Sequence, residues 1–296
     1  MLWGFGDFYH SPPNTPVMKA DVAWDGMADV FHEVLVDTID TIYLVAPAQC
    51  TLVALIDTLD TLPTTARVLA TECVVNRTMD NFMLATLAAD FIADTQLAIR
   101  TTTHTPASEI ITPGPGVTPK LVGPETIIPF TEQTNTVNSV ALDERHFAFD
   151  YNDIEADWQQ ADPYTIDTPP LSTVFESLEH DLSPSTARDF IQLLTATDAV
   201  PTYGDGVDAV TLVLLAAARN TAELNDVAAW ADEIGLASPA TISRAKRSLE
   251  DGGVIATAKV PIPTGRPRQQ LTLTDEYAAH DPPALADTVA DGLAAN

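Results

Sequence analysis

Six basic side chains lie close together near the C-terminal end of an otherwise acidic chain. They are Arg244, Lys246, Arg247, Lys259, Arg266 and Arg268. Residues 238–270 hold two acids, Glu250 and Asp251, so this stretch has a net charge of about +4 (six bases minus two acids), whereas the whole chain has −28. Guanidinium and ammonium groups bind phosphate oxygens, and arginine also binds guanine edges. A basic patch of this kind is the electrostatic footprint of a nucleic-acid-binding surface.

Three helices and a hairpin are the elements expected to hold these side chains. Apolar residues recur at helical spacing over 208–220 and 223–234, and a third helix is expected to start after Ser238 and to end before Gly252. Strands are expected at 254–262 and 269–274, on either side of a tip rich in Pro and Gly. Three helices followed by a hairpin is the order of a winged helix-turn-helix, whose last helix lies in the major groove of DNA.

The third helix has an apolar side and a polar side. Ile242, Ala245 and Leu249 share one stripe and are expected to pack inward, which leaves Arg244 and Arg247 facing outward. Helix N-termini and hydroxyl groups suit phosphates, and an arginine in the major groove suits guanine. The expected DNA-binding residues are Ser238, Ala240, Thr241, Ser243, Arg244, Lys246, Arg247, Arg266 and Arg268. The alternative is that these arginines only form ion pairs with the many surface acids.

The acidity of the whole chain indicates the salt content of its surroundings and not the charge of its binding partner. There are 42 acids and 14 bases, yet 46% of the residues are hydrophobic, so the chain is expected to fold. An acidic, lysine-poor surface over a foldable core is typical of haloarchaeal proteins, whose surroundings contain molar salt that screens the repulsion between acids. The composition therefore predicts a halophilic archaeal protein and does not exclude DNA as a partner.

The sequence lacks the motifs of membrane proteins, secreted proteins, metal sites and common enzymes. No run of about eighteen apolar residues indicates a membrane span and no secretory signal is evident, so a cytoplasmic location is expected. Cys50 and Cys73 lie in apolar runs, which favours buried free thiols over a disulfide or a metal pair. Phosphate-binding glycine loops, a nucleophile elbow and spaced metal ligands are missing, so we expect no enzymatic activity, no metal and no cofactor.

Residues 18–165 have the pattern of one α/β domain. Strands at 41–46, 67–71 and 96–101 alternate with helices at 23–36, 52–59 and 80–94, which predicts a parallel sheet. Shorter strands are expected at 120–123, 126–131, 136–142 and 146–151. Around this domain we expect a flexible extension at 1–17 (with Met18 as an alternative start), a helical linker at 166–200, the winged helix at 201–280 and a helix or tail at 281–296.

The α/β domain is expected to sense a metabolite or to dimerise. Ligands of open α/β sheets bind beyond the carboxyl ends of the strands, near helix N-termini. Asn76, Arg77 and Thr78 follow the second strand and are candidate residues for an anionic effector such as a sugar phosphate, although Arg77 would also suit a surface ion pair. Two candidate dimer surfaces, each of which could instead pack within the chain, are the helices at 171–196 and the stripe Leu285, Val289 and Leu293.

The C-terminal stretch resembles a known family. The run from Ser238 to Ile255, residues 264–268 and the run from Leu271 to Thr274 occur in the order found in archaeal winged-helix regulators. The whole chain resembles the TbsP family of haloarchaeal transcriptional regulators, which pair an N-terminal α/β domain with a C-terminal winged helix. The resemblance implies a homodimer that binds double-stranded promoter DNA near genes of glycolysis or gluconeogenesis. The alternative is a winged helix that contacts other proteins.

The N-terminal half resembles, more loosely, the effector domains of TrmB-type sugar-responsive regulators, which have a phospholipase-D-like fold. The His-x-Lys pattern of enzymes with that fold is absent, because His104 precedes Thr-Pro and His146 precedes Phe-Ala. The expected fold class is therefore α/β plus α+β, with a phospholipase-D-like or Rossmann-like N-terminal domain and a C-terminal winged helix-turn-helix. No catalytic residues are expected.

Overall fold

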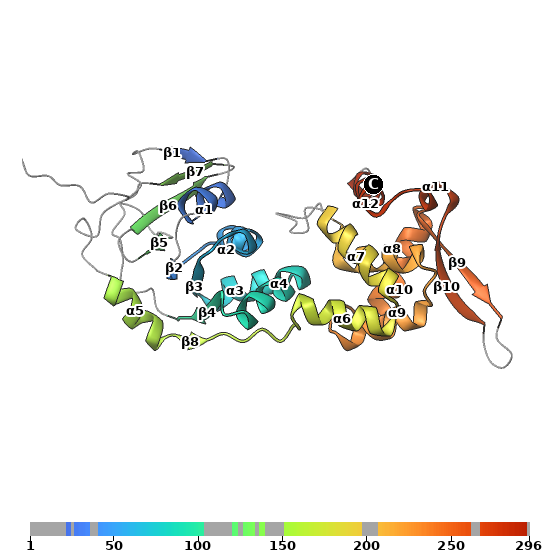
Figure 1. Ribbon diagram of the computed structural model, residues 1–296, viewed down its shortest axis with the longest axis horizontal. Helices are drawn as coiled ribbons and strands as arrows, with labels where there is room; N and C mark the ends of the chain where they lie inside the picture. Colours follow the sequence, from blue (N-terminus) through green and yellow to red (C-terminus); the bar gives the residue numbers. More distant parts are fainter. Residues whose placement is uncertain are drawn as a thin grey trace, which may run out of the picture.

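The computed structural model describes residues 22–24, 27–35, 41–103, 120–123, 127–133, 136–139, 151–196, 207–261 and 267–294. Figure 1 shows the described elements as two lobes along the long axis. One lobe contains the N-terminal sheet and its helices, and the other contains the C-terminal helices and a projecting hairpin. An extended segment between β8 (Asp162–Pro163) and α6 (Leu171–Asp181) joins the two lobes. Within the described ranges, no helix is both long and apolar enough to cross a membrane.

The N-terminal lobe is built on a mixed sheet with the strand order β1-β7-β6-β5-β2-β3-β4-β8. The strands besides β8 are β1 (Val22–Trp24), β2 (Thr41–Val45), β3 (Thr65–Ala70), β4 (Leu97–Thr101), β5 (Lys120–Val122), β6 (Ile127–Gln133) and β7 (Thr136–Ser139). The predicted parallel pairing holds for β2, β3 and β4. The other pairings are antiparallel, so the sheet as a whole is mixed.

Helices cover both faces of the parallel strands because alternate residues on each strand point to opposite faces. Ile42, Leu44 and Val68 pack against the helices α1 (Met27–Leu35), α2 (Gln49–Thr58), α3 (Glu72–Met79) and α4 (Phe82–Ala93). On the opposite face, Tyr43 and Val45 pack against α5 (Tyr151–Gln160). This two-sided burial explains why the strands appear in the sequence as continuous apolar runs.

Polar and ionic contacts attach α5 to the sheet. The Arg67 guanidinium lies 3.0 Å from the Glu155 carboxylate, and the Tyr43 hydroxyl donates a hydrogen bond to the same carboxylate. The side chain of Arg100 donates to the Trp158 carbonyl at 2.8 Å, near the C-terminal end of α5, and its guanidinium lies 4.9 Å from the centre of the Trp158 ring. Arg67 and Arg100 therefore hold α5 against the strands.

Several expectations for the N-terminal half need correction. The helix expected at 23–36 is present as α1 but starts at Met27, because Val22–Trp24 form β1. The helix α3 was not predicted. Most of the strand expected at 146–151 lies outside the described ranges, and Tyr151 is the first residue of α5. Cys50 is half-buried and Cys73 is exposed on α3, so neither is the fully buried thiol expected, although both are free cysteines.

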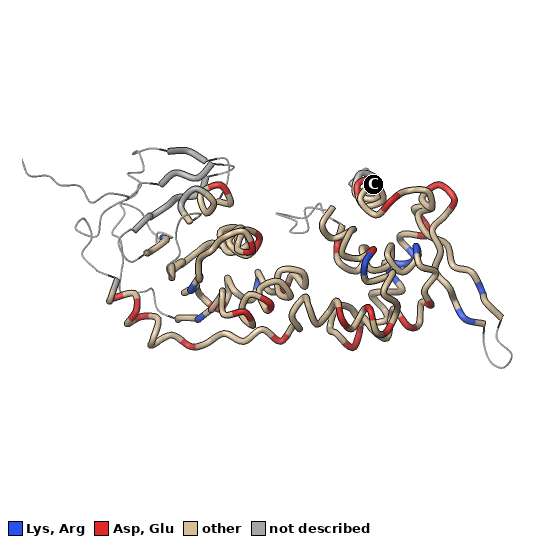
Figure 2. The backbone as a smooth tube through the Cα atoms, viewed as in Figure 1, with Lys and Arg blue, Asp and Glu red and all other residues tan. Residues whose placement is uncertain are grey.

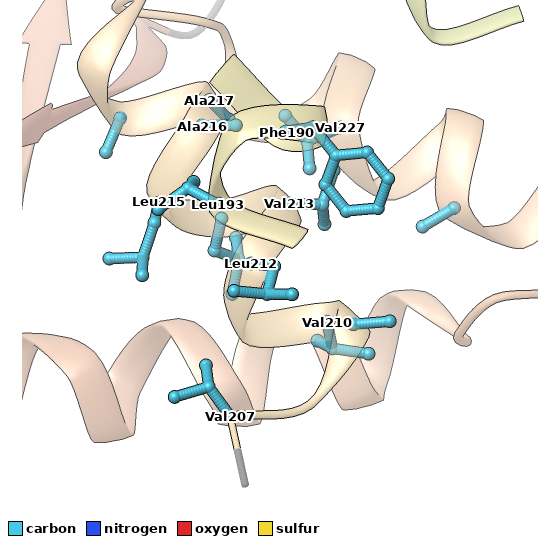
Figure 3. Packing of buried hydrophobic residues seen from close by; sticks show 14 of the residues in the cluster. Phe190, Leu193, Val207, Val210, Leu212, Val213, Leu215, Ala216, Ala217 and Val227 are labelled. Carbon is cyan, nitrogen blue, oxygen red and sulfur yellow. The ribbon is translucent and has the colours of Figure 1, made fainter. Parts of the chain in front are cut away.

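The C-terminal lobe packs around the helix α8 (Ala209–Arg219). All its residues from Ala209 to Ala218 are buried. Figure 3 shows Phe190 of α7 (Pro184–Ala196) beside Val213 of α8, and Leu193 and Leu212 belong to the same buried cluster. The other elements of this lobe are α6, α9 (Leu224–Glu233), α10 (Pro239–Asp251), β9 (Ile255–Val260), β10 (Arg268–Leu273), α11 (Asp275–Ala278) and α12 (Pro282–Ala294).

The helices considered as dimer surfaces pack within the chain. Helices α6 and α7 contribute Val174, Leu178 and Phe190 to the same core as α8, and α12 packs against α7. Leu285 and Val289 of α12 are 0% and 2% exposed, so these two residues of the stripe face the chain's own core. Leu293 lies on α12, but its side chain is not among those that the structure describes.

The buried lysine of β5 provides a test of the N-terminal core. Lys120 is only 1% exposed, and desolvation lowers its pKa from 10.5 to about 8 even though Asp157 opposes the shift. Between these pH values the unfolded chain binds a proton that the folded chain does not, so stability should rise as the pH rises from 8 to 10.5. Lys120→Met should remove this rise and should stabilise the chain at pH 7 by roughly 3 kcal/mol.

Urea denaturation at constant salt, repeated between pH 7 and pH 10, measures this effect. Lys120→Arg is the matched control, because it keeps a charge in the same place throughout that range. A Lys120→Met chain whose stability follows the same pH curve as the parent chain would contradict the prediction.

Candidate nucleic-acid interface

The helices α9 and α10 form a helix-turn-helix. Gly235, in the turn, has φ +75°, a left-handed conformation that glycine adopts without strain. The helix α10 starts where expected. Ser238 is its N-cap and accepts a hydrogen bond from the Thr241 amide at 3.3 Å, and Pro239 occupies the first helical position. These local signals determine where the exposed helix begins.

The predicted division of α10 into two faces is confirmed. Ile242 and Leu249 are buried, and Ala245 packs against the same core. The residues exposed on the opposite side are Ala240, Ser243, Arg244, Arg247, Ser248 and Asp251. The Ser243 hydroxyl donates to the Pro239 carbonyl at 2.8 Å and so lies along the outer surface of the helix. The arginines thus stand on the exposed side of the second helix of the motif.

Arg244 and Arg247 form no ion pair with any residue that the structure describes. This is unusual for a chain in which acids outnumber bases three to one (42 against 14). The acid nearest to them in sequence on the exposed side is Asp251, one turn beyond Arg247. Arg247 is close enough to Glu250 to help lower the pKa of that carboxyl, but Glu250 is itself bound by Lys246 and Thr257. The described contacts therefore do not support the alternative in which both arginines serve only as intrachain ion-pair partners.

Two other bases of the expected set point toward partners within the chain. Lys246 lies 2.8 Å from the Glu250 carboxylate and is 17% exposed at its side chain. Arg268 donates to Glu223 at 2.6 Å, but 54% of its side chain stays exposed. Both were expected among the DNA contacts. Glu250 follows Lys246 by four residues on the same helix, a spacing that the sequence already shows, whereas only the fold brings Glu223 near Arg268.

The strands β9 and β10 form the wing. They pair antiparallel from Ile255↔Leu273 to Val260↔Arg268. The segment before α9 extends this hairpin, because Leu271 donates its amide to the Ala222 carbonyl at 2.9 Å. Figure 2 shows basic residues on both wing strands. Lys259 is exposed there and had been counted only as part of the basic stretch, whereas Arg266 lies outside the described ranges.

The candidate effector residues lie elsewhere than expected. Asn76, Arg77 and Thr78 belong to the C-terminal half of α3 and not to a loop before a helix. The Asn76 side chain accepts a hydrogen bond from the Tyr164 hydroxyl at 2.9 Å, and buried Thr78 donates to the Val74 carbonyl at 2.9 Å. The end of a helix carries a partial negative charge, which disfavours an anion. The expected placement was wrong because α3 begins at Glu72, directly after β3.

The fold and the exposed arginines define the C-terminal lobe as a helix-turn-helix domain with a small β-hairpin wing. Two family models then match the chain. Residues 19–169 match the model described as transcriptional regulator TbsP-like, N-terminal, and residues 170–290 match transcriptional regulator TbsP-like, C-terminal HTH domain. The chain belongs to the TbsP-like transcriptional regulators, and it is not an enzyme. Comparisons with curated proteins and with solved structures gave no match.

The N-cap of α10 yields a prediction about stability. Ser238→Ala removes the acceptor for the Thr241 amide, so it should lower the free energy of unfolding by about 1 kcal/mol. Urea denaturation of the full chain measures this change. Ser248→Ala, an exposed serine in the last turn of the same helix, is the matched control and should leave stability within about 0.5 kcal/mol of the parent. Equal losses in both variants would show that the cap is not the cause.

Proposed function

We propose that this regulator reads DNA sequence with the exposed side of α10. Arg244 and Arg247 would reach base edges in the major groove, with Ala240, Ser243 and the first turn at Ser238 and Thr241 close to the bases or phosphates. The observation that carries this proposal is that both arginines are exposed on the second helix of a helix-turn-helix and have no described ion-pair partner. The wing would add phosphate contacts through Lys259, Arg266 and Arg268.

High salt constrains how such an interface gains affinity. Binding weakens by about 0.9 log unit per phosphate contact for each log unit of salt. With roughly four contacts, a change from ~0.1 M to ~3 M salt would cost about five orders of magnitude. We therefore propose that base-edge contacts and dimerisation contribute much of the affinity in the molar salt that the acidic composition predicts.

We further propose that the target genes belong to central carbon metabolism, that the protein acts in the cytoplasm of a halophilic archaeon, and that it binds promoters as a homodimer. The TbsP-like family and the acidic composition support these assignments. For the N-terminal domain we retain both folds named above, the phospholipase-D-like and the Rossmann-like. Its parallel strands run in the sequential order β2-β3-β4, an order that the first three strands of a Rossmann sheet also have.

A metabolite-sensing or dimerising N-terminal domain needs a route to the DNA-binding helices, and α6 offers one. Asp90 of α4 accepts hydrogen bonds from the Ser172 amide at 3.1 Å and from its hydroxyl at 2.6 Å, at the start of α6. One and a half turns later, Ser177 accepts a hydrogen bond from the Trp230 indole of α9 at 3.0 Å. A shift of α4 would thus be passed through α6 to the helix-turn-helix.

The DNA-reading proposal is tested by removing each exposed arginine. Arg244→Ala and Arg247→Ala should each weaken binding about 10- to 100-fold, because a lost bidentate base contact is worth about 1–3 kcal/mol. Affinity is measured in molar KCl by fluorescence anisotropy, with a duplex that the parent chain selects from a random-sequence DNA library. Arg188→Ala is the matched control, since this exposed arginine lies on α7 in the same lobe.

Two outcomes would overturn the proposal. If Arg188→Ala weakens binding as much as the α10 variants, the effect is one of general charge and α10 does not read the sequence. If the parent chain selects no duplex at any salt concentration, the alternative of a winged helix that contacts other proteins is favoured.

The route through α6 makes a separate prediction. Asp90→Ala removes the acceptor at the N-terminus of α6 and should destabilise the contact between α4 and α6 by about 1 kcal/mol. Hydrogen–deuterium exchange should become faster at the start of α6 and in α9, with the sheet unchanged. Asp94→Ala, an exposed acid just after α4, is the control. Faster exchange confined to α4 would contradict a connection to α9.

A further inference from the structure

Three polar side chains connect the DNA-facing helix α10 to the wing. The Lys246 ammonium lies 2.8 Å from Glu250 Oε2 and 3.2 Å from Thr257 Oγ1. The Thr257 hydroxyl in turn donates to Glu250 Oε1 at 2.5 Å. Each of the three groups therefore contacts the other two. Lys246 and Glu250 are one turn apart on α10, whereas Thr257 belongs to β9, so this closed set of contacts, which we call the brace, joins two different elements.

The brace is shielded from solvent. The side chains of Lys246 and Glu250 are 17% and 28% exposed, and Thr257 is half-buried. Although desolvation acts in the opposite direction, the hydrogen bonds from Lys246 and Thr257 hold the pKa of Glu250 below its ordinary value. Glu250 is therefore ionised at neutral pH. A partly buried, charge-assisted contact is stronger and less screened by salt than an exposed ion pair.

The position of Thr257 links the brace to the bases of the wing. Thr257 pairs with Leu271, which is fully buried, so this side of the hairpin faces the core. Lys259 lies two residues further along β9 and therefore on the same side of the strand as Thr257. Fixing Thr257 against α10 thus fixes the direction in which Lys259 and the rest of the wing leave the domain.

Lys246 does not share the exposed side of α10 with the two arginines. Arg244 and Arg247 are exposed and have no described ion pair, whereas the Lys246 ammonium is directed toward β9. An ammonium engaged by a carboxylate and a hydroxyl would have to give up both contacts to reach a phosphate. Lys246 thus belongs to the same basic stretch as the two arginines but has different surroundings.

We infer that Lys246, Glu250 and Thr257 are positioning residues that set the wing at a fixed angle to α10, so that wing and helix contact one DNA duplex together. This inference rests on the proposed DNA-reading function. Lys246 accordingly contributes to affinity through Thr257 and not through a phosphate of its own. A phosphate contact and a brace differ in their salt dependence, because only the contact releases a counterion.

A double-mutant cycle separates the two roles. Thr257→Val keeps the shape of the side chain and removes both hydrogen bonds of the hydroxyl, while Thr257→Ser keeps the hydroxyl. Thr257→Val should weaken binding to the selected duplex roughly 3- to 10-fold, as expected for the loss of a typical intramolecular hydrogen bond. Lys246→Met should weaken it by a similar factor, the double variant should be no weaker than either single variant, and Thr257→Ser should bind like the parent chain.

The salt dependence of binding distinguishes the brace from a direct contact between Lys246 and a phosphate. If Lys246 contacts a phosphate, Lys246→Met lowers the slope of log affinity against log salt by about 0.9, and its effect adds to that of Thr257→Val. That combination would overturn the inference. Arg247→Ala, measured on the same duplex, tests the DNA-reading function separately, so its failure to weaken binding would count against that function and not against the brace.

The brace can also be tested without DNA. Hydrogen–deuterium exchange of the free chain should be faster in β9 and β10 of Thr257→Val than in the parent, with α8 and α9 unchanged and Thr257→Ser like the parent. Unchanged exchange in both wing strands would overturn the brace whether or not the chain binds the duplex. Uniformly faster exchange across the C-terminal lobe would also overturn it, because Thr257 would then support the whole domain and not the direction of the wing.

Discussion

Burial of α8 is the constraint on which the DNA-binding lobe depends. Every residue from Ala209 to Ala218 is buried, so this helix has no polar side that could face water. It can exist only if other elements surround it, and the core around it includes residues of α6, α7, α9, α10, β10 and α12. Because apolar burial contributes about 25 cal/mol per Å², a fully enclosed helix supplies much of the energy that holds the exposed α10 and the wing in place.

Because the surface is so acidic, a base without an acidic partner is unexpected and points to a base that is available for another contact. In a chain with 42 acids and 14 bases, a surface base should readily find an acid. Arg219 does so with Asp189 at 3.1 Å, as Lys246 does with Glu250 and Arg268 does with Glu223. Arg244 and Arg247 do not, because the buried stripe of α10 turns them away from the rest of the lobe. The fold thus leaves the guanidinium groups of these two arginines accessible to an anion of another molecule.

The sequence was informative where the deciding interactions are local. The start of α10 follows from Ser238 and Pro239, and its two faces follow from helical spacing, so both were predicted. The contacts of Thr257 with Lys246 and of Glu223 with Arg268 were not predictable, because they form only after the hairpin has folded back, whereas Glu250 lies four residues after Lys246 on the same helix. The helix α5 lies on the far face of the sheet through contacts of Arg67 and Arg100, which sequence spacing does not show. Tertiary contacts decided these cases.

The two lobes share a helix contact that makes separate motion of one lobe difficult. Met83 of α4, an N-terminal element, is 4% exposed and belongs to the core that surrounds α8. The carboxylate of Asp90, two turns further along α4, accepts the hydrogen bonds at the start of α6. A rearrangement of the sheet that moved α4 would either break these contacts or carry α6 with it. Since α6 also contacts Trp230 of α9, the second possibility moves the helix-turn-helix, and the N-terminal domain gains a direct mechanical influence on how α10 is presented.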